Sequence, residues 1–177
     1  MTSLGVGVVV PVRNGAAQLG EALTSVLTQE PAPADVVVVD GGSTDGSDEV
    51  ARSFTGVRVV NQVGRGLAGA RNQGLAVVAG ELIAFCDADD RWTSGSLATR
   101  LVALDATGAD AVVGHLTARA LRGDVPAGLA DRIGRPVPGY TPGALLVRRP
   151  TLDAVGPFDE ALAIGTDSDW FVRLVQS

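Results

Sequence analysis

A chain of 177 residues, 46% hydrophobic and 19% charged, is long enough for one substantial core and too apolar to be disordered. Its formal net charge of −6 excludes a general nucleic-acid binder, which would carry a basic face. All 14 basic residues are arginines, so no lysine is available for a P-loop or for a Schiff base.

The single cysteine, Cys86, excludes an internal disulfide and fits a reducing compartment. Residues 1–12 lack a basic stretch and a cleavage-like site, and the apolar run Val6–Val12 is too short to cross a bilayer. We therefore expect a soluble, cytoplasmic chain with no transmembrane segment. It could still act peripherally at a membrane.

The first elements in chain order form a βαβ unit. Residues 5–12 are a fully apolar strand, residues 16–29 have the spacing of an amphipathic helix, and residues 35–40 are a second buried strand. Two continuous apolar strands around a helix predict a parallel pair with a right-handed crossover. Asn14 is the expected cap of the helix.

The second strand ends in Asp40 and the glycine-rich stretch 41–47. Glycines here let backbone N–H groups approach a ligand, and Ser43, Thr44 and Asp45 can cap the helix that follows. Taken alone, an ordinary strand-to-helix turn explains this stretch better than a binding loop. The fingerprint G-x-G-x-x-G is missing after the first strand, which argues against hydride transfer.

A third strand over 57–61 and a helix from 64 to about 79 lead to the acidic end of a fourth strand. Leu82–Cys86 is a short apolar run, and Asp87, Asp89 and Asp90 follow it. Carboxylates this close repel one another unless a cation or hydrogen-bond donors hold them. Mg²⁺ and Mn²⁺ bind such oxygens together with phosphates. On spacing alone, a polar loop that caps a helix is an equal explanation.

The rest of the chain is less regular. A helix is predicted over 94–107, a strand over 109–118, a strand over 144–148 and a short helix over 151–155. His115 lies within the second of these segments, where a structural role is favoured over metal ligation. Residues 123–142 are rich in Gly and Pro and predict a long surface loop, which often belongs to a binding site.

The last segment is a predicted helix with Asp167 and Asp169 at its amino end. The helix dipole favours carboxylates at this position. Capping alone explains one of them. Two carboxylates beside Trp170 point to a catalytic base.

Seven short motifs occur in a fixed order along the chain: VVPVRNG at 9–15, VVDGGSTDG at 38–46, ARNQG at 70–74, IAFCDADDRW at 83–92, LLVRR at 145–149, VGPFDE at 155–160 and TDSDW at 166–170. Each is weak singly, but the ordered set resembles a family 2 inverting glycosyltransferase of the GT-A fold over nearly the whole chain. The resemblance implies a mostly parallel, Rossmann-like three-layer α/β/α sandwich. It also implies one catalytic domain over 1–177, with a nucleotide-binding half (1–92) and an acceptor-side half (93–177).

The resemblance assigns a donor site to the first half of the chain. Pro11, Val12 and Arg13 would line the pocket of the nucleotide base, and Asp40 would hydrogen-bond the base. Arg71 would help to hold the nucleotide.

The resemblance also assigns the metal and the general base. Asp87, Ala88 and Asp89 match a D-x-D element, in which Asp87 would face the ribose or sugar. Asp89 would hold Mn²⁺ or Mg²⁺ on the diphosphate. Asp167 matches the general base, and Asp169 is a rival two residues later.

The implied reaction is metal-dependent transfer of a sugar, with inversion, from a nucleoside-diphosphate sugar to an acceptor hydroxyl. A UDP-sugar is the first expectation for the donor, and a glycan, a lipid-linked molecule or a small molecule for the acceptor. Gly41 replaces a second Asp of the family, Thr166 replaces a Glu, and the chain stops soon after the base, so the acceptor-side half is expected to be short.

These departures keep open a catalytically silent nucleotide-sugar binding module. A nucleotidyltransferase is a third reading, disfavoured because no Lys is present to handle a triphosphate.

Overall fold

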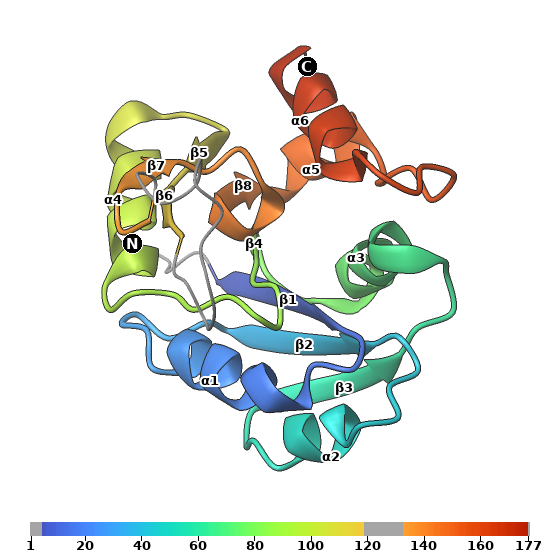
Figure 1. Ribbon diagram of the computed structural model, residues 1–177. Helices are drawn as coiled ribbons and strands as arrows, with labels where there is room; N and C mark the ends of the chain where they lie inside the picture. The colour runs from blue at the N-terminus through green and yellow to red at the C-terminus, as the bar shows by residue number, and fades with distance from the viewer. Residues whose placement is uncertain (1–4, 119–132, 177) are drawn as a thin grey trace.

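The computed structural model describes residues 5–118 and 133–176 and contains a six-stranded sheet in the order β3-β2-β1-β4-β8-β5 (Figure 1). Its first four strands are parallel, and β8 runs antiparallel to both β4 and β5. The strands are β1 (Val6–Val12), β2 (Asp35–Asp40), β3 (Val57–Asn61), β4 (Leu82–Phe85), β5 (Ala111–Val113) and β8 (Leu145–Arg148). The described helices are α1 (Ala16–Leu27), α2 (Ser47–Arg52), α3 (Gly66–Val77), α4 (Ser96–Thr107), α5 (Arg149–Val155), α6 (Thr166–Gln176) and the 3₁₀ turn η2 (Pro142–Ala144).

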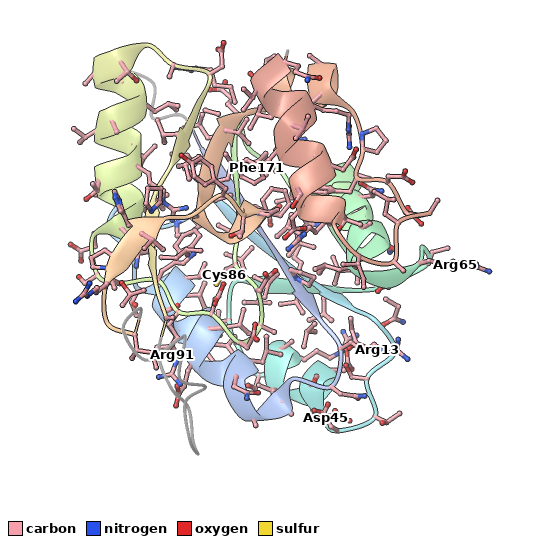
Figure 2. The ribbon with its side chains drawn as sticks, turned by 45° about the horizontal axis from the view of Figure 1, so that its top comes forward. Arg13, Asp45, Arg65, Cys86, Arg91 and Phe171 are labelled. Atoms are coloured by element: carbon pink, nitrogen blue, oxygen red, sulfur yellow. The ribbon has the colours of Figure 1, made fainter. Side chains whose placement is uncertain are left out.

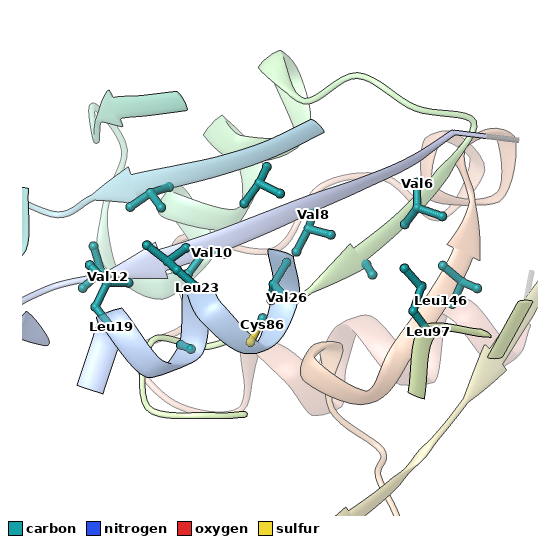
Figure 3. Close-up of a cluster of buried hydrophobic side chains, with 14 of the residues drawn as sticks. Val6, Val8, Val10, Val12, Leu19, Leu23, Val26, Cys86, Leu97 and Leu146 are labelled. Atoms are coloured by element: carbon teal, nitrogen blue, oxygen red, sulfur yellow. The ribbon is translucent and has the colours of Figure 1, made fainter. Parts of the chain in front are cut away.

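Helices cover both faces of this sheet, which confirms the predicted three-layer sandwich. Alternate residues of β1 point to opposite faces, so Val8 belongs to a hydrophobic cluster that includes residues of α1, α2 and α4, and Val9 to a second cluster that includes residues of α3, α5 and α6. Figure 3 shows the first of these clusters, in which Val8, Val10 and Val12 lie beside Leu19, Leu23 and Val26 of α1, while Val6 lies toward Leu97 and Leu146. Burial on both faces explains why β1 is apolar throughout, as parallel strands usually are.

The predicted strand over 109–118 is divided at Gly114, which is a correction to the sequence reading. Its second part, β6 (His115–Thr117), leaves the main sheet and pairs with β7 (Pro136–Pro138). The predicted loop over 123–142 is therefore wrong for 136–138, while 123–132 lie outside the described residues. Two prolines hid this strand, because proline is tolerated in a strand only at an edge. His115 is exposed on this small sheet.

The parallel strands place several polar residues along one edge of the sheet. Val12 pairs with Asp40, and Asp40 pairs with Asn61, so the ends of β1, β2 and β3 are level. The segment that follows β4 leaves from the same edge, because β4 is parallel to β1. Ligands of open α/β sheets bind at such carboxyl ends.

No helix in the described part of the chain is long and apolar enough to span a membrane.

An ion pair at the opposite edge ties β2, β3 and the end of α3 together. The carboxylate of Asp35 accepts hydrogen bonds from Arg58 Nε at 3.0 Å, from Arg58 Nη2 at 2.6 Å and from the backbone N–H of Ala79 at 2.7 Å. The bonds from Arg58 are the main cause that lowers the pKa of Asp35 below its ordinary value of 3.8.

We expect Asp35→Asn to lower the free energy of unfolding by about 1 kcal/mol at neutral pH, because the Arg58 bonds lose their charge. A lowered folded-state pKa means that this stabilisation is complete above the unfolded value of 3.8 and is lost as pH falls through the folded value. Urea denaturation should therefore show a difference between wild type and variant that shrinks at acid pH. Asp48→Asn, which removes the more exposed i,i+4 pair with Arg52, should destabilise the protein less, because solvent screens that pair. A constant difference at every pH would contradict the assignment.

Candidate functional site

The site is organised by the fully buried guanidinium of Arg71 on α3. Its Nη1 donates to Asp167 Oδ1 at the start of α6. Its Nη2 lies 3.2 and 3.3 Å from the two carboxylate oxygens of Asp87, just after β4. The ring of Phe158 lies under the guanidinium, 5.5 Å from its carbon. One cation therefore brings together two carboxylates that the sequence placed in separate motifs.

The carboxylates after β4 lie in an environment that disfavours their charge. Burial is the largest cause that raises the pKa of Asp87, and Arg71 opposes it, while the charges of Asp167 and Asp89 raise it further. Burial also raises the pKa of Asp90, followed by the charges of Asp87 and Asp89. The repulsion expected from the sequence is thus present, and Arg71 compensates it only at Asp87.

A divalent cation would fit this cluster only as a partner of a phosphate ligand. Within residues 5–118 and 133–176, no three His, Cys, Asp or Glu side chains are grouped as a complete metal site. Asp89 is exposed beside Asp87 and Asp90, and no described residue donates a hydrogen bond to its carboxylate. Mg²⁺ and Mn²⁺ are commonly held by one or two carboxylates plus substrate phosphates. The oxygen donors present suit that arrangement.

Asp40 lies at the end of β2 with its side chain buried. Its two oxygens accept from the backbone N–H of Ser43 at 3.3 and 3.1 Å, which closes the turn after the strand. Gly41 follows, and a Cβ there would lie 2.9 Å from Gln62 Oε1 and 3.3 Å from the Cβ of Arg13. A side chain at position 41 would therefore require the tip of Gln62 to move and would pack tightly against Arg13.

The three residues predicted to line the base pocket differ in what they offer. Pro11 and Val12 are buried within β1, and the side chain of Val12 packs into the core with α1. Arg13 is exposed at the strand end, beside the turn that carries Asp45 (Figure 2). Ala88 is half-buried against the same core. Among the three residues predicted to line the base pocket, Pro11, Val12 and Arg13, only Arg13 has an exposed side chain.

The loops after β1 and β2 are bound to each other by side chains that the sequence reading placed differently. Asn14 does not cap α1; it accepts from the backbone N–H of Thr44 at 2.9 Å. Asp45 serves two helix starts: its Oδ2 accepts from the N–H of Ala16 in α1 at 2.9 Å, and its Oδ1 accepts from the N–H of Ser47 in α2 at 3.1 Å. The bond to α2 agrees with the prediction from the sequence, and the bond to α1 was missed because local spacing cannot show a partner from another segment. This network fixes the edge at which Asp40 and Arg13 lie.

The motif at 70–74 joins the site through every one of its polar side chains. Asn72 exchanges two hydrogen bonds with the backbone of Phe158, at 2.9 and 2.8 Å. Gln73 donates to the carbonyl of Asn61 and accepts from the N–H of Val63. These roles of Asn72 and Gln73 were missed from the sequence, where the resemblance gave a role within this motif to Arg71 alone.

Asp167 and Asp169 share the first turn of α6 but have different partners. Asp169 accepts from Arg173 Nε at 3.0 Å and Nη2 at 2.9 Å. Arg173 also donates to the backbone carbonyls of Val155 and Pro157, so this pair fixes α6 to the end of α5. Asp167 faces Arg71, and Thr166 donates to the same carboxylate at 3.3 Å. Asp167 belongs to the cluster with Asp87, and Asp169 does not.

The sequence matches the profile of the family described as Glycosyl transferase family 2 over residues 7–156. Among curated proteins, the succinoglycan biosynthesis protein ExoU of Rhizobium meliloti is 32% identical over 94% of this chain and 55% of its own length. The glycosyltransferase AglE of Haloferax volcanii is 29% identical over 95% of this chain and 60% of its own length. The chain therefore spans only part of each of these relatives.

Solved structures give the same fold. The structure of S. aureus TarS 1-349 in complex with UDP aligns with a TM-score of 0.78 and 22% sequence identity. The alignment covers 97% of this chain and 55% of the TarS chain. The mannosyltransferase PcManGT of Pyrobaculum calidifontis, in complex with GDP-Man and Mn²⁺, aligns with a TM-score of 0.65 and 26% identity over 94% of this chain and 50% of its own. The predicted GT-A fold is confirmed.

Proposed function

The chain belongs to glycosyl transferase family 2, and from this premise we propose that it is a metal-dependent inverting glycosyltransferase. Its donor would be a nucleoside-diphosphate sugar and its acceptor a hydroxyl group. The observation that carries the proposal is the Arg71 bridge, which holds a donor-side carboxylate, Asp87, beside a second carboxylate, Asp167. Donor residues would come from 1–92 and the base from 93–177.

We assign the general base to Asp167 and a structural role to Asp169. Inversion needs one displacement at the anomeric carbon, in which a carboxylate takes the proton of the attacking hydroxyl. In each carboxylate one oxygen accepts both side-chain bonds, Oδ1 of Asp167 and Oδ2 of Asp169, so the two are separated by their place and not by a free oxygen. Asp167 is joined through Arg71 to Asp87 on the donor side, whereas Asp169 is paired with Arg173 outside that cluster. Arg71 acts as a positioning residue, because a fully buried guanidinium cannot touch a nucleotide in this arrangement.

The donor would lie along the edge formed by the ends of β1, β2 and β4. Asp40 and the backbone of Val12 would face the base, and Arg13 offers the exposed charge at the same edge. A divalent metal, when bound, would neutralise the charge that develops on the leaving diphosphate. Asp89 would hold it, since this carboxylate is exposed and lacks a donor within the described residues. Relatives of the fold bind UDP, UDP-GlcNAc, or GDP-Man with Mn²⁺, and we take a UDP-sugar as the first candidate.

The proposal is tested by thermal unfolding with UDP, GDP, CDP and dTDP sugars, each with Mn²⁺, Mg²⁺ or EDTA, followed by an assay for released nucleoside diphosphate. A ligand that binds only the folded state raises the unfolding midpoint. One base should raise it in metal and not in EDTA, and its diphosphate should be released when a hydroxyl acceptor is added. Binding without release under any condition would instead indicate a silent nucleotide-sugar binding module.

We expect Asp89→Ala to abolish the metal-dependent part of the midpoint shift, because the exposed carboxylate that holds the cation is gone. The shift in EDTA should be unchanged. The matched control is Asp105→Ala, an exposed carboxylate on α4, which should keep the full metal-dependent shift. Metal-dependent binding that survives in Asp89→Ala would remove the assignment of Asp89.

A further inference from the structure

A cavity of about 520 Å³ lies beside Asp167, between Arg65–Ala68 at the start of α3 and Glu160–Asp167 before and at the start of α6. In Figure 1 the segment between α5 and α6 reaches toward the start of α3. Sites for small molecules usually have volumes of roughly 300–1,000 Å³. The cavity therefore has room for one sugar-sized molecule with a substituent.

The walls of this cavity are mostly apolar and open to solvent. Leu67, Leu162 and Ile164 are all exposed, and Ile164 is 90% exposed. Large apolar side chains gathered around one concave site indicate a ligand that covers them.

The charged groups of the cavity are few, and one is already engaged. Glu160 Oε2 accepts from the backbone N–H of Arg65 at 3.0 Å, and its Oε1 accepts from Asn72 Nδ2 at 3.1 Å. These bonds lower the pKa of Glu160 and hold the 160–165 segment against α3. The other charged lining residues are Asp167 and Arg65, and the side chain of Arg65 is exposed. The cavity therefore has charges of both signs, so its apolar walls, and not its net charge, indicate the class of ligand.

We propose that this cavity is the acceptor site and that it takes a hydroxyl acceptor carrying an alkyl or aryl group. The inference rests on the proposed function and names its acceptor class. The apolar group would lie against Leu67, Leu162 and Ile164, which places the hydroxyl at Asp167. The hydroxyl oxygen then bonds to the anomeric carbon, its proton passes to the Asp167 carboxylate, and the diphosphate leaves with the electron pair of the broken bond.

The test compares matched methyl and octyl glycosides of glucose, galactose and N-acetylglucosamine as acceptors for wild type, below the micelle concentration. We expect kcat/KM for an octyl glycoside to exceed that of its methyl partner by about tenfold or more, as apolar pockets discriminate. Ile164→Ser should reduce this ratio severalfold. Val175→Ser is the matched control, because Val175 is 83% exposed on α6 and outside the cavity lining, and its ratio should equal that of wild type.

A second readout is calorimetric binding of the octyl glycosides to the protein with nucleoside diphosphate and metal present. Three results would each overturn the proposed acceptor class: equal kcat/KM for methyl and octyl glycosides, an unchanged octyl-to-methyl ratio in Ile164→Ser, or no binding of octyl glycosides. If the protein still binds and hydrolyses the donor, the proposed function stands. Absence of any donor binding would instead overturn the proposed function, and this inference with it.

Discussion

Asp167→Asn is expected to lower kcat for sugar transfer by about 10²- to 10⁴-fold while donor binding stays at the wild-type level. The amide keeps the shape of the carboxylate, and its oxygen can still accept from Arg71, so the fold should be retained. What is lost is the basic oxygen that takes the proton of the acceptor. Transfer is measured as released nucleoside diphosphate, and donor binding as the metal-dependent shift of the unfolding midpoint.

Asp169→Asn is the matched comparison, because it makes the same change two residues along the same helix. Its carboxylate is bound by Arg173, so we expect a modest loss of stability and nearly normal kcat. If transfer survives in Asp167→Asn and fails in Asp169→Asn, the base belongs at 169. If both variants transfer normally, neither carboxylate is the base, and the assignment built on the Arg71 bridge is wrong.

Arg71→Met should lower the free energy of unfolding by about 3 kcal/mol, because it leaves Asp87 and Asp167 close together without their shared cation. Methionine fills much of the same volume, so the loss reports the charge rather than a cavity. Transfer should also fall, since neither carboxylate is then held in place. Urea denaturation and the transfer assay measure the two effects.

A double-mutant cycle separates charge from packing at this position. Arg71→Met combined with Asp87→Asn should be more stable than Arg71→Met alone, because one of the unpaired carboxylates has been removed. Arg71→Lys should recover only part of the stability, since a single ammonium cannot match a guanidinium that reaches two carboxylates. If the changes in the free energy of unfolding caused by Arg71→Met and Asp87→Asn are purely additive, the two residues are not coupled and the Arg71 bridge to Asp87 is wrong.

The central strands and the sheet edge at which the site forms could be predicted from the sequence, whereas β6 and β7 could not. The apolar runs at 6–12, 35–40 and 82–85 are buried on both faces, so their composition identified them as central parallel strands. Acidic residues after β2 and β4 then had to share one edge, because parallel strands end together. The ordered motifs added the family, which the profile over 7–156 confirms.

Only the tertiary structure decided which polar groups meet. The sequence did not show that α3 packs against the sheet with the guanidinium of Arg71 buried between Asp87 and Asp167. Asp45 bonds to the start of α2, as predicted, and also to the start of α1, which the sequence did not show. Local sequence spacing predicts the strands because each buried strand is a run of consecutive apolar residues. It cannot predict contacts such as that of Arg71 with Asp167, because long-range partners are fixed by packing between distant segments.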